Sequence, residues 1–182
     1  MPIYTRTGDD GTTALFGGKR ILKCEELVDV YGSIDELNSW IGLVASYLDI
    51  PDVQQFLHDI QADLFVIGST LAGGSIDFDG AEKRVKEMEA RIDAMETELP
   101  KIHNFLLPGG TTLSGHIHVA RSICRRVERQ TVALAQREKG VNKGMIKYLN
   151  RLSDLLFTLA RFINNNAHVE ETAWIGKPRQ KF

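Results

Sequence analysis

The sequence contains little cysteine, no long apolar run and no excess of charge of one sign. The two cysteines, Cys24 and Cys124, are too few for a disulfide framework or a cysteine-rich zinc site, so we expect both to be reduced. The apolar residues are interrupted too often to span a bilayer, and no basic stretch leads into an apolar one near the start. We therefore expect a cytoplasmic protein without a membrane partner.

Charge is nearly balanced, with 22 Lys and Arg against 24 Asp and Glu, for a formal net charge of -2. Because no strong positive field surrounds such a chain, we expect no nucleic-acid partner, and any anion site must be local. The chain has 182 residues, of which 43% are hydrophobic. This length and composition predict one domain with a full core.

Several common catalytic motifs are also missing from the sequence. His116 and His118 are two residues apart, which places them on different sides of a helix, and neither has a partner at a zinc-protease spacing. The Glu-x-x-His pairs of di-iron bundles, a Gly-x-Ser-x-Gly elbow and a recognisable Cys/His nucleophile are absent. We therefore expect no metal site built from side chains, and a cofactor or substrate that carries the difficult chemistry.

The N-terminal segment, residues 4–20, is rich in threonine, glycine and basic residues. Glycines let consecutive backbone N–H groups converge on an anion, while hydroxyls and bases add donors and charge. The segment is not a P-loop, because Thr13 stands where a glycine is required and Arg20 where Ser or Thr should follow the lysine. Composition alone is compatible both with a cradle for polyphosphate and with a mobile polar terminus.

Apolar residues recur at helical spacing in five stretches, and no strand-like alternation of useful length is present. Short connections between these stretches predict an all-α fold, a single five-helix bundle. In the third stretch Asp79 and Glu82 resemble a capping box, and Lys139-Gly140 would close the fourth. The expected helices run from Lys23 to Leu48, from Pro51 to Leu71, from about Glu82 to Leu99, from Leu113 to Leu134 and from Ile146 to Ile163.

The fourth expected helix carries a polar stripe beside its core face. His118, Arg121, Arg125 and Glu128 recur there at spacings of three and four. Arg121 and Arg125 are like charges one turn apart, which is unfavourable unless an anion lies near them. Guanidinium groups suit phosphate and carboxylate oxygens, so the stripe favours an anion site. A solvated basic face is the alternative interpretation.

Polar residues also gather elsewhere. On the fifth expected helix Asn150, Asp154 and Arg161 belong to a stripe opposite the leucines, which either faces water or makes specific hydrogen bonds. On the first, Asp35 could pair with an arginine across helices or across subunits. The connection between residues 100 and 111 contains Phe105 and is unusually apolar, a character typical of loops that line a site.

Five segments, taken in order, resemble the PduO-type ATP:cob(I)alamin adenosyltransferases. The resemblance extends from about Tyr4 to about Asn165 and implies a five-helix bundle that assembles as a homotrimer, with active sites between subunits. It also implies transfer of the 5′-deoxyadenosyl group of ATP to cob(I)alamin, which yields adenosylcobalamin and releases triphosphate. The segments are Thr5 to Thr13, Tyr31 to Ser39, Phe105 to Gly110, Ala120 to Arg129 and Tyr148 to Asp154.

The same resemblance assigns roles to residues. Arg125, Lys23 and a magnesium ion bound through ATP would stabilise the departing triphosphate. Phe105 would lie beneath the corrin ring of cobalamin and exclude the lower axial ligand, which makes cobalt easier to reduce. Arg121 would pair with Asp35 across the interface. The residues implied for ATP are Thr5, Arg6, Thr7, Gly8, Thr13, Ala14, Lys23, Arg125, Arg126, Glu128, Arg129 and Asn150.

From this resemblance and the length of the chain, we expect residues 1–182 to form one adenosyltransferase domain. It divides into an ATP-binding segment (1–22), a helix bundle (23–168) and a C-terminal tail (169–182) whose role stays open. A cobalamin-reducing partner is compatible with this function. The alternative function is a non-catalytic bundle that binds ATP as a sensor. Phe105 favours catalysis, because a sensor of ATP has no use for an aromatic residue at a corrin face.

Overall fold

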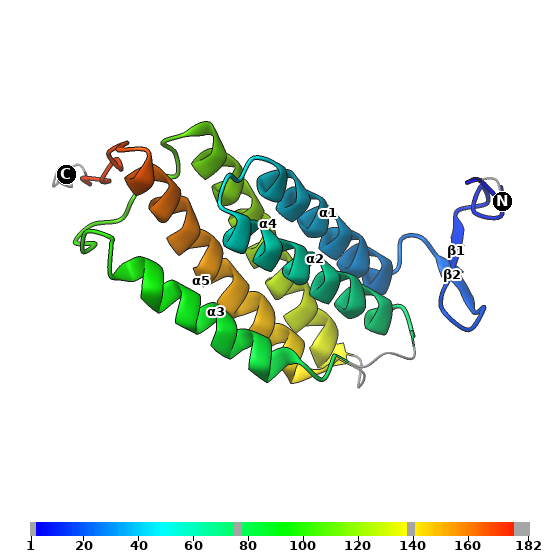
Figure 1. Ribbon diagram of the computed structural model, residues 1–182. Coiled ribbons are helices and arrows are strands. Elements are labelled where there is room, and N and C mark those ends of the chain that lie inside the picture. The colour runs from blue at the N-terminus through cyan, green and yellow to red at the C-terminus, as the bar shows by residue number, and fades with distance from the viewer. Residues whose placement is uncertain (1–2, 75–77, 138–140, 177–182) are drawn as a thin grey trace, which may run out of the picture.

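The computed structural model describes residues 3–74, 78–137 and 141–176 of the chain. Helices account for most of this part (Figure 1), so the all-α fold and the five-helix bundle predicted from the sequence are confirmed. The helices are α1 (Glu26–Ser46), α2 (Pro51–Leu71), α3 (Ala81–Glu96), α4 (Thr112–Arg137) and α5 (Lys143–Asn166), and they follow two short strands, β1 (Thr12–Ala14) and β2 (Arg20–Leu22).

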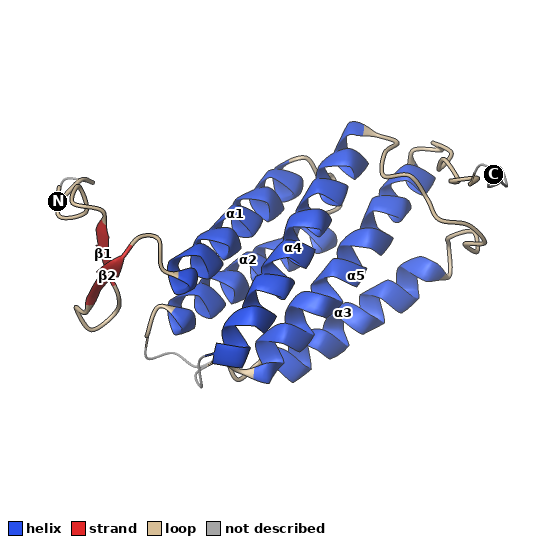
Figure 2. Cartoon of the chain, turned by 180° about the vertical axis from the view of Figure 1, so that it is seen from behind, coloured by secondary structure: helices blue, strands red, loops and turns tan. Residues whose placement is uncertain are grey.

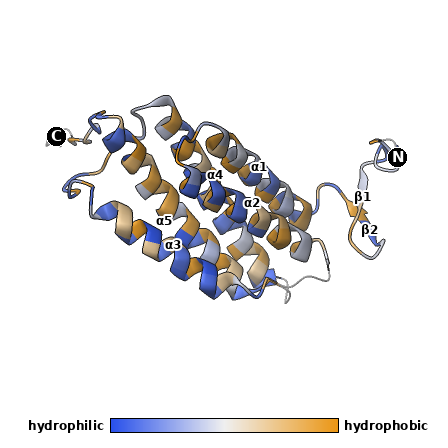
Figure 3. Cartoon of the chain, in the orientation of Figure 1, coloured by the Kyte–Doolittle hydropathy of each residue, from blue (hydrophilic) through white to orange (hydrophobic). Residues whose placement is uncertain are grey.

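The two longest helices, α4 and α5, pack against each other along the middle of the bundle. Helix α1 packs on α4 and α2 on α1, whereas α3 packs on the other side, against α5 (Figure 2). The apolar faces meet inside this arrangement (Figure 3), where Leu37, Ile60 and Leu152 are completely buried. The 3.6-residue spacing of apolar side chains thus positions each helix by its core face. Among the described helices none is long and apolar enough to cross a membrane.

The hairpin of β1 and β2 was not predicted from the sequence. The strands pair antiparallel with Thr13 opposite Ile21, and the connecting turn uses Gly17 and Gly18 at positive φ. Strands of three residues are too short for a readable alternation, so no periodic signal marks them. The hairpin lies beyond one end of the bundle, and the C-terminal tail lies at the other end (Figure 1).

Helix boundaries depart from the sequence-based expectation in several places. Helix α1 begins at Glu26 and not at Lys23, which precedes it in a turn. The expected capping box is wrong, because Gly80 is the N-cap of α3 and no side chain caps that end. Helix α5 begins earlier than predicted, since the side chain of Asn142 accepts a hydrogen bond from the backbone N–H of Gly144 at 2.7 Å. The expected closure of α4 at Lys139-Gly140 lies outside the described residues.

Candidate functional site

The N-terminal segment is curled by two basic residues. The Nζ of Lys23 donates to the carbonyl oxygen of Gly8 at 2.8 Å. Arg20 contacts the carbonyl oxygen of Thr7, and its Nε donates to Oγ1 of Thr12 at 3.0 Å. Both bases therefore hold the loop that carries the predicted ATP-binding residues. Sequence reasoning counted Arg20 among the bases of the segment but did not predict its contact with Thr7, because the two residues are 13 positions apart.

Most of the predicted ATP-binding residues of this segment are open to solvent within the single chain. Thr5, Arg6, Thr7 and Ala14 are exposed, and Thr13 is half-buried in the hairpin. Arg6 has φ of 62°, in the left-handed region, which tightens the turn. The loop thus presents hydroxyl, backbone and guanidinium groups outward, as a binding surface for an anion requires.

A groove of about 670 Å³ runs between α3, α4 and α5 and is lined by Arg121 and Arg125. Arg125 is exposed and makes no hydrogen bond or ion pair with the described part of its own chain. Arg151, across the groove, pairs with Glu89 at 3.0 Å and with Asp154 at 2.6 Å. The acidic groups near the groove are thus partly neutralised by Arg151, which leaves Arg125 as an available cation.

Arg121 is half-buried beneath this groove, with its guanidinium 6.0 Å from the centre of the Phe157 ring. Burial lowers the pKa of Arg121, and the neighbouring charge of Arg125 lowers it further. Its Nε is buried and has no hydrogen-bond partner among the described residues. A buried donor without an acceptor is costly, so this group calls for a partner from outside the bundle.

His118 of the polar stripe on α4 is buried. It is 7% exposed, and its ring lies 6.2 Å from that of Phe157. Burial, with a smaller effect from Arg121, lowers the pKa of His118 to about 4. His118 is therefore neutral near pH 7 and packs like an apolar ring. It lies on the same side of α4 as Arg121, as its spacing predicts, because both residues lie against Phe157.

The other residues of α4 and α5 that were predicted to bind ATP do not share one face of α4. Arg126 pairs with Glu36 of α1, and Arg129 lies near Arg126 in a surface hollow beside α1. Glu128 accepts a hydrogen bond from Nδ2 of Asn150 at 2.9 Å. The structure therefore does not bring all predicted ATP-binding residues into one pocket of a single chain, and the N-terminal segment lies off the bundle (Figure 1).

Phe105 belongs to the connection between α3 and α4 and is 81% exposed. Its backbone pairs with the C-terminal tail: the N–H of Trp174 donates to the carbonyl oxygen of Phe105 at 2.6 Å, and that of Leu107 to Thr172 at 2.9 Å. From Val169 to Gly176 the tail is irregular apart from this short pairing. An exposed aromatic ring thus projects from a backbone that is held in place.

No group of three or more His, Cys, Asp and Glu within the described ranges could hold a metal ion. Asp35 of α1 is exposed and, in the part of the chain that the structure describes, has no ion-pair partner. The ion pair with Arg121 that the resemblance implies is therefore not made within one chain.

The arrangement defines a class of fold: a bundle of five helices that follows a short β-hairpin. A solved structure of a variant PduO-type ATP:corrinoid adenosyltransferase from Lactobacillus reuteri, complexed with cobalamin and ATP, is similar with a TM-score of 0.90 and 35% sequence identity. The match covers 96% of this chain and 100% of that chain.

Sequence comparison gives the family. The chain is 41% identical over 180 residues to the corrinoid adenosyltransferase of Bacillus subtilis, which covers 96% of this chain and 92% of the relative. It is 40% identical to the corrinoid adenosyltransferase PduO of Citrobacter freundii, of which it spans 51%. The sequence model of a family described as "Cobalamin adenosyltransferase" matches residues 3–163. This chain belongs to the cobalamin adenosyltransferase family, and the enzyme class predicted from its sequence is confirmed.

Proposed function

We propose that the protein, through the residues described above, catalyses transfer of the 5′-deoxyadenosyl group of ATP to cob(I)alamin, forming adenosylcobalamin and releasing triphosphate. The observation that carries this proposal is the pair of arginines on α4, one exposed in a groove and one half-buried without an acceptor. Family membership and the likeness to a structure complexed with cobalamin and ATP support the same reaction.

In this proposal the cobalt of the substrate is the nucleophile, and the protein contributes binding, orientation and charge. Negative charge grows on the triphosphate as the bond to C5′ breaks. Arg125 and Lys23 would stabilise that charge, because both are exposed cations that can turn toward a phosphate. Lys23 now contacts a carbonyl oxygen of the loop, a contact that a phosphate oxygen can replace.

Magnesium would enter with ATP. Phosphate oxygens are hard ligands that suit this ion, and Mg²⁺ commonly keeps several waters when it is bound with a nucleotide. This fits a chain whose described residues offer no three-ligand cluster of their own. The ion would add to the stabilisation of the leaving triphosphate.

Phe105 would form an apolar wall beneath the corrin ring. Its ring is free of contacts that would hide it, and Leu107, two residues further, is 49% exposed. A wall of this kind keeps a donor from the lower face of cobalt, and cobalt without that donor is easier to reduce to the nucleophilic state.

We further propose that the site is completed in a homotrimer. The hairpin extends beyond its own bundle, to which the N–H of Phe16 holds it by a hydrogen bond to the carbonyl oxygen of Ala72 at 3.0 Å, and from this place it would reach a neighbouring subunit. Exposed Asp35 of one subunit would accept the buried donor of Arg121 on the next, which would remove an unsatisfied charge. The ATP-binding residues of the N-terminal segment would then meet Arg125, Arg126, Glu128, Arg129 and Asn150 of the neighbouring subunit.

Three expectations from the sequence stay predictions. They are the cytoplasmic location, the cobalamin-reducing partner and the division of one domain into an ATP-binding segment (1–22), a bundle (23–168) and a tail (169–182).

The decisive experiment mixes the protein with reduced cobalamin, Mg²⁺ and ATP and follows the cobalt–carbon product by its absorption spectrum. We expect the product and equimolar triphosphate, and neither without ATP. A protein that binds ATP tightly but forms no product would instead be the ATP sensor considered from the sequence.

A further inference from the structure

We infer that Arg161 and Glu171 are positioning residues, which clamp the C-terminal tail and the start of the α3–α4 connection to α5 and so set the place of Phe105. The inference rests on the proposed function, in which Phe105 forms the wall beneath the corrin ring. It gives a structural role to the buried charge of Arg161 and to the C-terminal tail, neither of which takes part in the proposed reaction.

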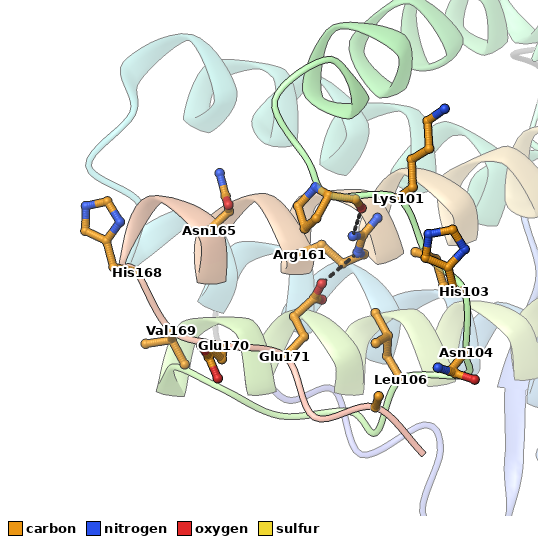
Figure 4. Close-up of a pocket in the computed structure, with 13 residues that line it drawn as sticks. Lys101, His103, Asn104, Leu106, Arg161, Asn165, His168, Val169, Glu170 and Glu171 are labelled. Carbon is orange, nitrogen blue, oxygen red and sulfur yellow. Dashed lines mark hydrogen bonds and ion pairs between the residues drawn. The ribbon is translucent and has the colours of Figure 1, made fainter. Parts of the chain in front are cut away.

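The clamp is centred on one guanidinium group. Arg161 lies in the last third of α5 and is only 4% exposed. Its Nε donates to Oε2 of Glu171 at 2.9 Å, and its Nη2 donates to the carbonyl oxygen of Pro100 at 2.7 Å (Figure 4). One side chain thus joins α5 to two segments that approach from different parts of the chain.

Both of these segments lead directly to Phe105. Pro100 opens the connection that carries the ring, and Glu171 immediately precedes the tail residues that pair with it. The pairing consists of the hydrogen bonds of Leu107 with Thr172 and of Trp174 with Phe105, around the bridge of Leu106 and Ala173. A shift of the tail would therefore carry the backbone of Phe105 with it.

A second buried residue, one turn further along α5, holds the other end of the connection. Asn164 is 1% exposed; its Oδ1 accepts from the N–H of Thr111 at 3.0 Å, and its Nδ2 donates to the carbonyl oxygen of Gly109 at 2.9 Å. Phe105 lies between these two anchors. The anchors hold the backbone on both sides, while the ring itself stays exposed.

Stability alone does not account for a buried ion pair at this place. Desolvation of two charges offsets most of their attraction, and apolar residues of similar size are often as stabilising. An arginine fork adds something different, because its donors point in fixed directions and can join two partners at a defined angle. Since the exposed ring of Phe105 has little packing to orient it, the backbone geometry that Arg161 fixes decides where the ring lies.

The test uses Glu171→Gln, which keeps the shape and an acceptor but removes the charge, and Glu170→Gln as the matched control on the exposed neighbour. Arg161→Met is the more severe variant and risks misfolding. We expect Glu171→Gln to fold, to bind ATP as the unchanged protein does, and to show faster hydrogen exchange at the amides of Leu107 and Trp174. Turnover should fall roughly tenfold, as small displacements of a positioned group can cause. The fraction of four-coordinate cob(II)alamin formed with ATP should fall with it, while Glu170→Gln changes neither quantity.

A double-mutant cycle with Phe105→Ala then separates the two hypotheses. If the clamp acts through the ring, Glu171→Gln adds no further loss in the Phe105→Ala background. An equal loss in both backgrounds, or unchanged exchange at Leu107 and Trp174, would overturn the clamp. If Phe105→Ala itself leaves the cobalt spectrum unchanged, the wall in the proposed function is wrong, even where hydrogen exchange shows that the clamp holds the backbone.

Discussion

Three arginine residues of this chain differ in their burial and in their hydrogen-bond partners. Arg125 is exposed and unpaired within the described chain, Arg121 is half-buried with a free donor, and Arg161 is buried with Nε and Nη2 each donating a hydrogen bond. Physical chemistry assigns them different tasks: an exposed cation can meet a phosphate, an unsatisfied one requires a partner, and a satisfied one holds structure. At the residue scale, burial and partners decide the role.

Arg125→Ala should abolish most of the activity with little effect on folding, since the side chain is exposed. Loss of one charge that stabilises the leaving triphosphate is expected to lower kcat about 100-fold or more. Steady-state kinetics with varied ATP measures this. Arg137→Ala is the matched control, because Arg137 is also an exposed arginine of α4 and pairs with Glu26. Turnover of Arg125→Ala equal to that of the control would reject the assigned role.

His118 should make stability depend on pH. Its pKa of about 4 in the folded chain lies below the ordinary value of 6.5, so the unfolded state binds the proton first. Stability is therefore full above pH 6.5, declines as the pH falls from 6.5 to 4, and loses nothing further from this group below 4.

Between pH 7 and pH 4.5 the loss attributable to His118 should be about 2 kcal/mol. Urea unfolding at both pH values, compared with a His118→Gln variant that does not titrate, isolates the contribution. The free energy of unfolding should fall more steeply with decreasing pH in the unchanged protein than in His118→Gln. Parallel falls in the two proteins would show that His118 is not held neutral by burial.

At the scale of elements, the α3–α4 connection departs most from what its composition suggests. Its apolar residues do not form a core, since Phe105 and Leu107 are exposed, but its backbone is fastened to α5 and to the tail. Buried polar side chains of α5 supply the fastening, and Gly110 permits it through its φ of 106°. The backbone of the α3–α4 connection is therefore held in place while its apolar side chains are exposed, which suits a surface that would bind the flat corrin ring.

Gly110→Ala should destabilise the protein by about 2 kcal/mol, because an alanine is strained at this φ and its Cβ would overlap the amide of Asn164. Gly109→Ala is the matched control, since a Cβ there has no neighbour within 4 Å and should change stability by less than about 1 kcal/mol. Thermal unfolding of both variants measures the difference. Equal midpoints would mean that Asn164 does not confine the turn.

At the scale of the whole molecule, the chain has its functional groups at separate places. The hairpin extends from one end of the bundle and the tail lies toward the other (Figure 1). Phe105 pairs with the tail, and Arg125 lies midway along α4. A single chain does not assemble these groups into one pocket. Neighbouring copies that lie side by side can do so, which is why we propose that sites form between subunits.

Asp35→Asn should weaken assembly, turnover or both, because an amide lacks the charge that the half-buried Arg121 requires. Loss of the charge of one partner in a desolvated pair is expected to weaken subunit association by roughly tenfold or more. Sedimentation velocity over a dilution series, read together with specific activity, tests this. Asp49→Asn, an exposed carboxylate in the α1–α2 connection, should assemble as the unchanged chain does. A fully active trimer of Asp35→Asn would contradict the pairing.

The sequence determined the helices and the family. The spacing of apolar residues is a local pattern, so the buried faces that contain Leu37, Ile60 and Leu152 can be predicted from neighbouring residues. Five segments in the same order are sufficient for the resemblance to the family. The same reasoning placed Arg121 and Arg125 on successive turns. It missed the hairpin, because three-residue strands are too short to show a period.

Tertiary structure alone decided which polar groups are buried and what they hold. His118 and Arg161 belong to polar stripes for which the sequence left open whether they face water, and the packed structure buries both. Arg161 finds its partners 10 and 61 residues away, and Asn164 contacts Thr111 across 53 residues. Contacts between segments so distant in the chain leave no periodic or local pattern, because they arise only when the packed core brings those segments together.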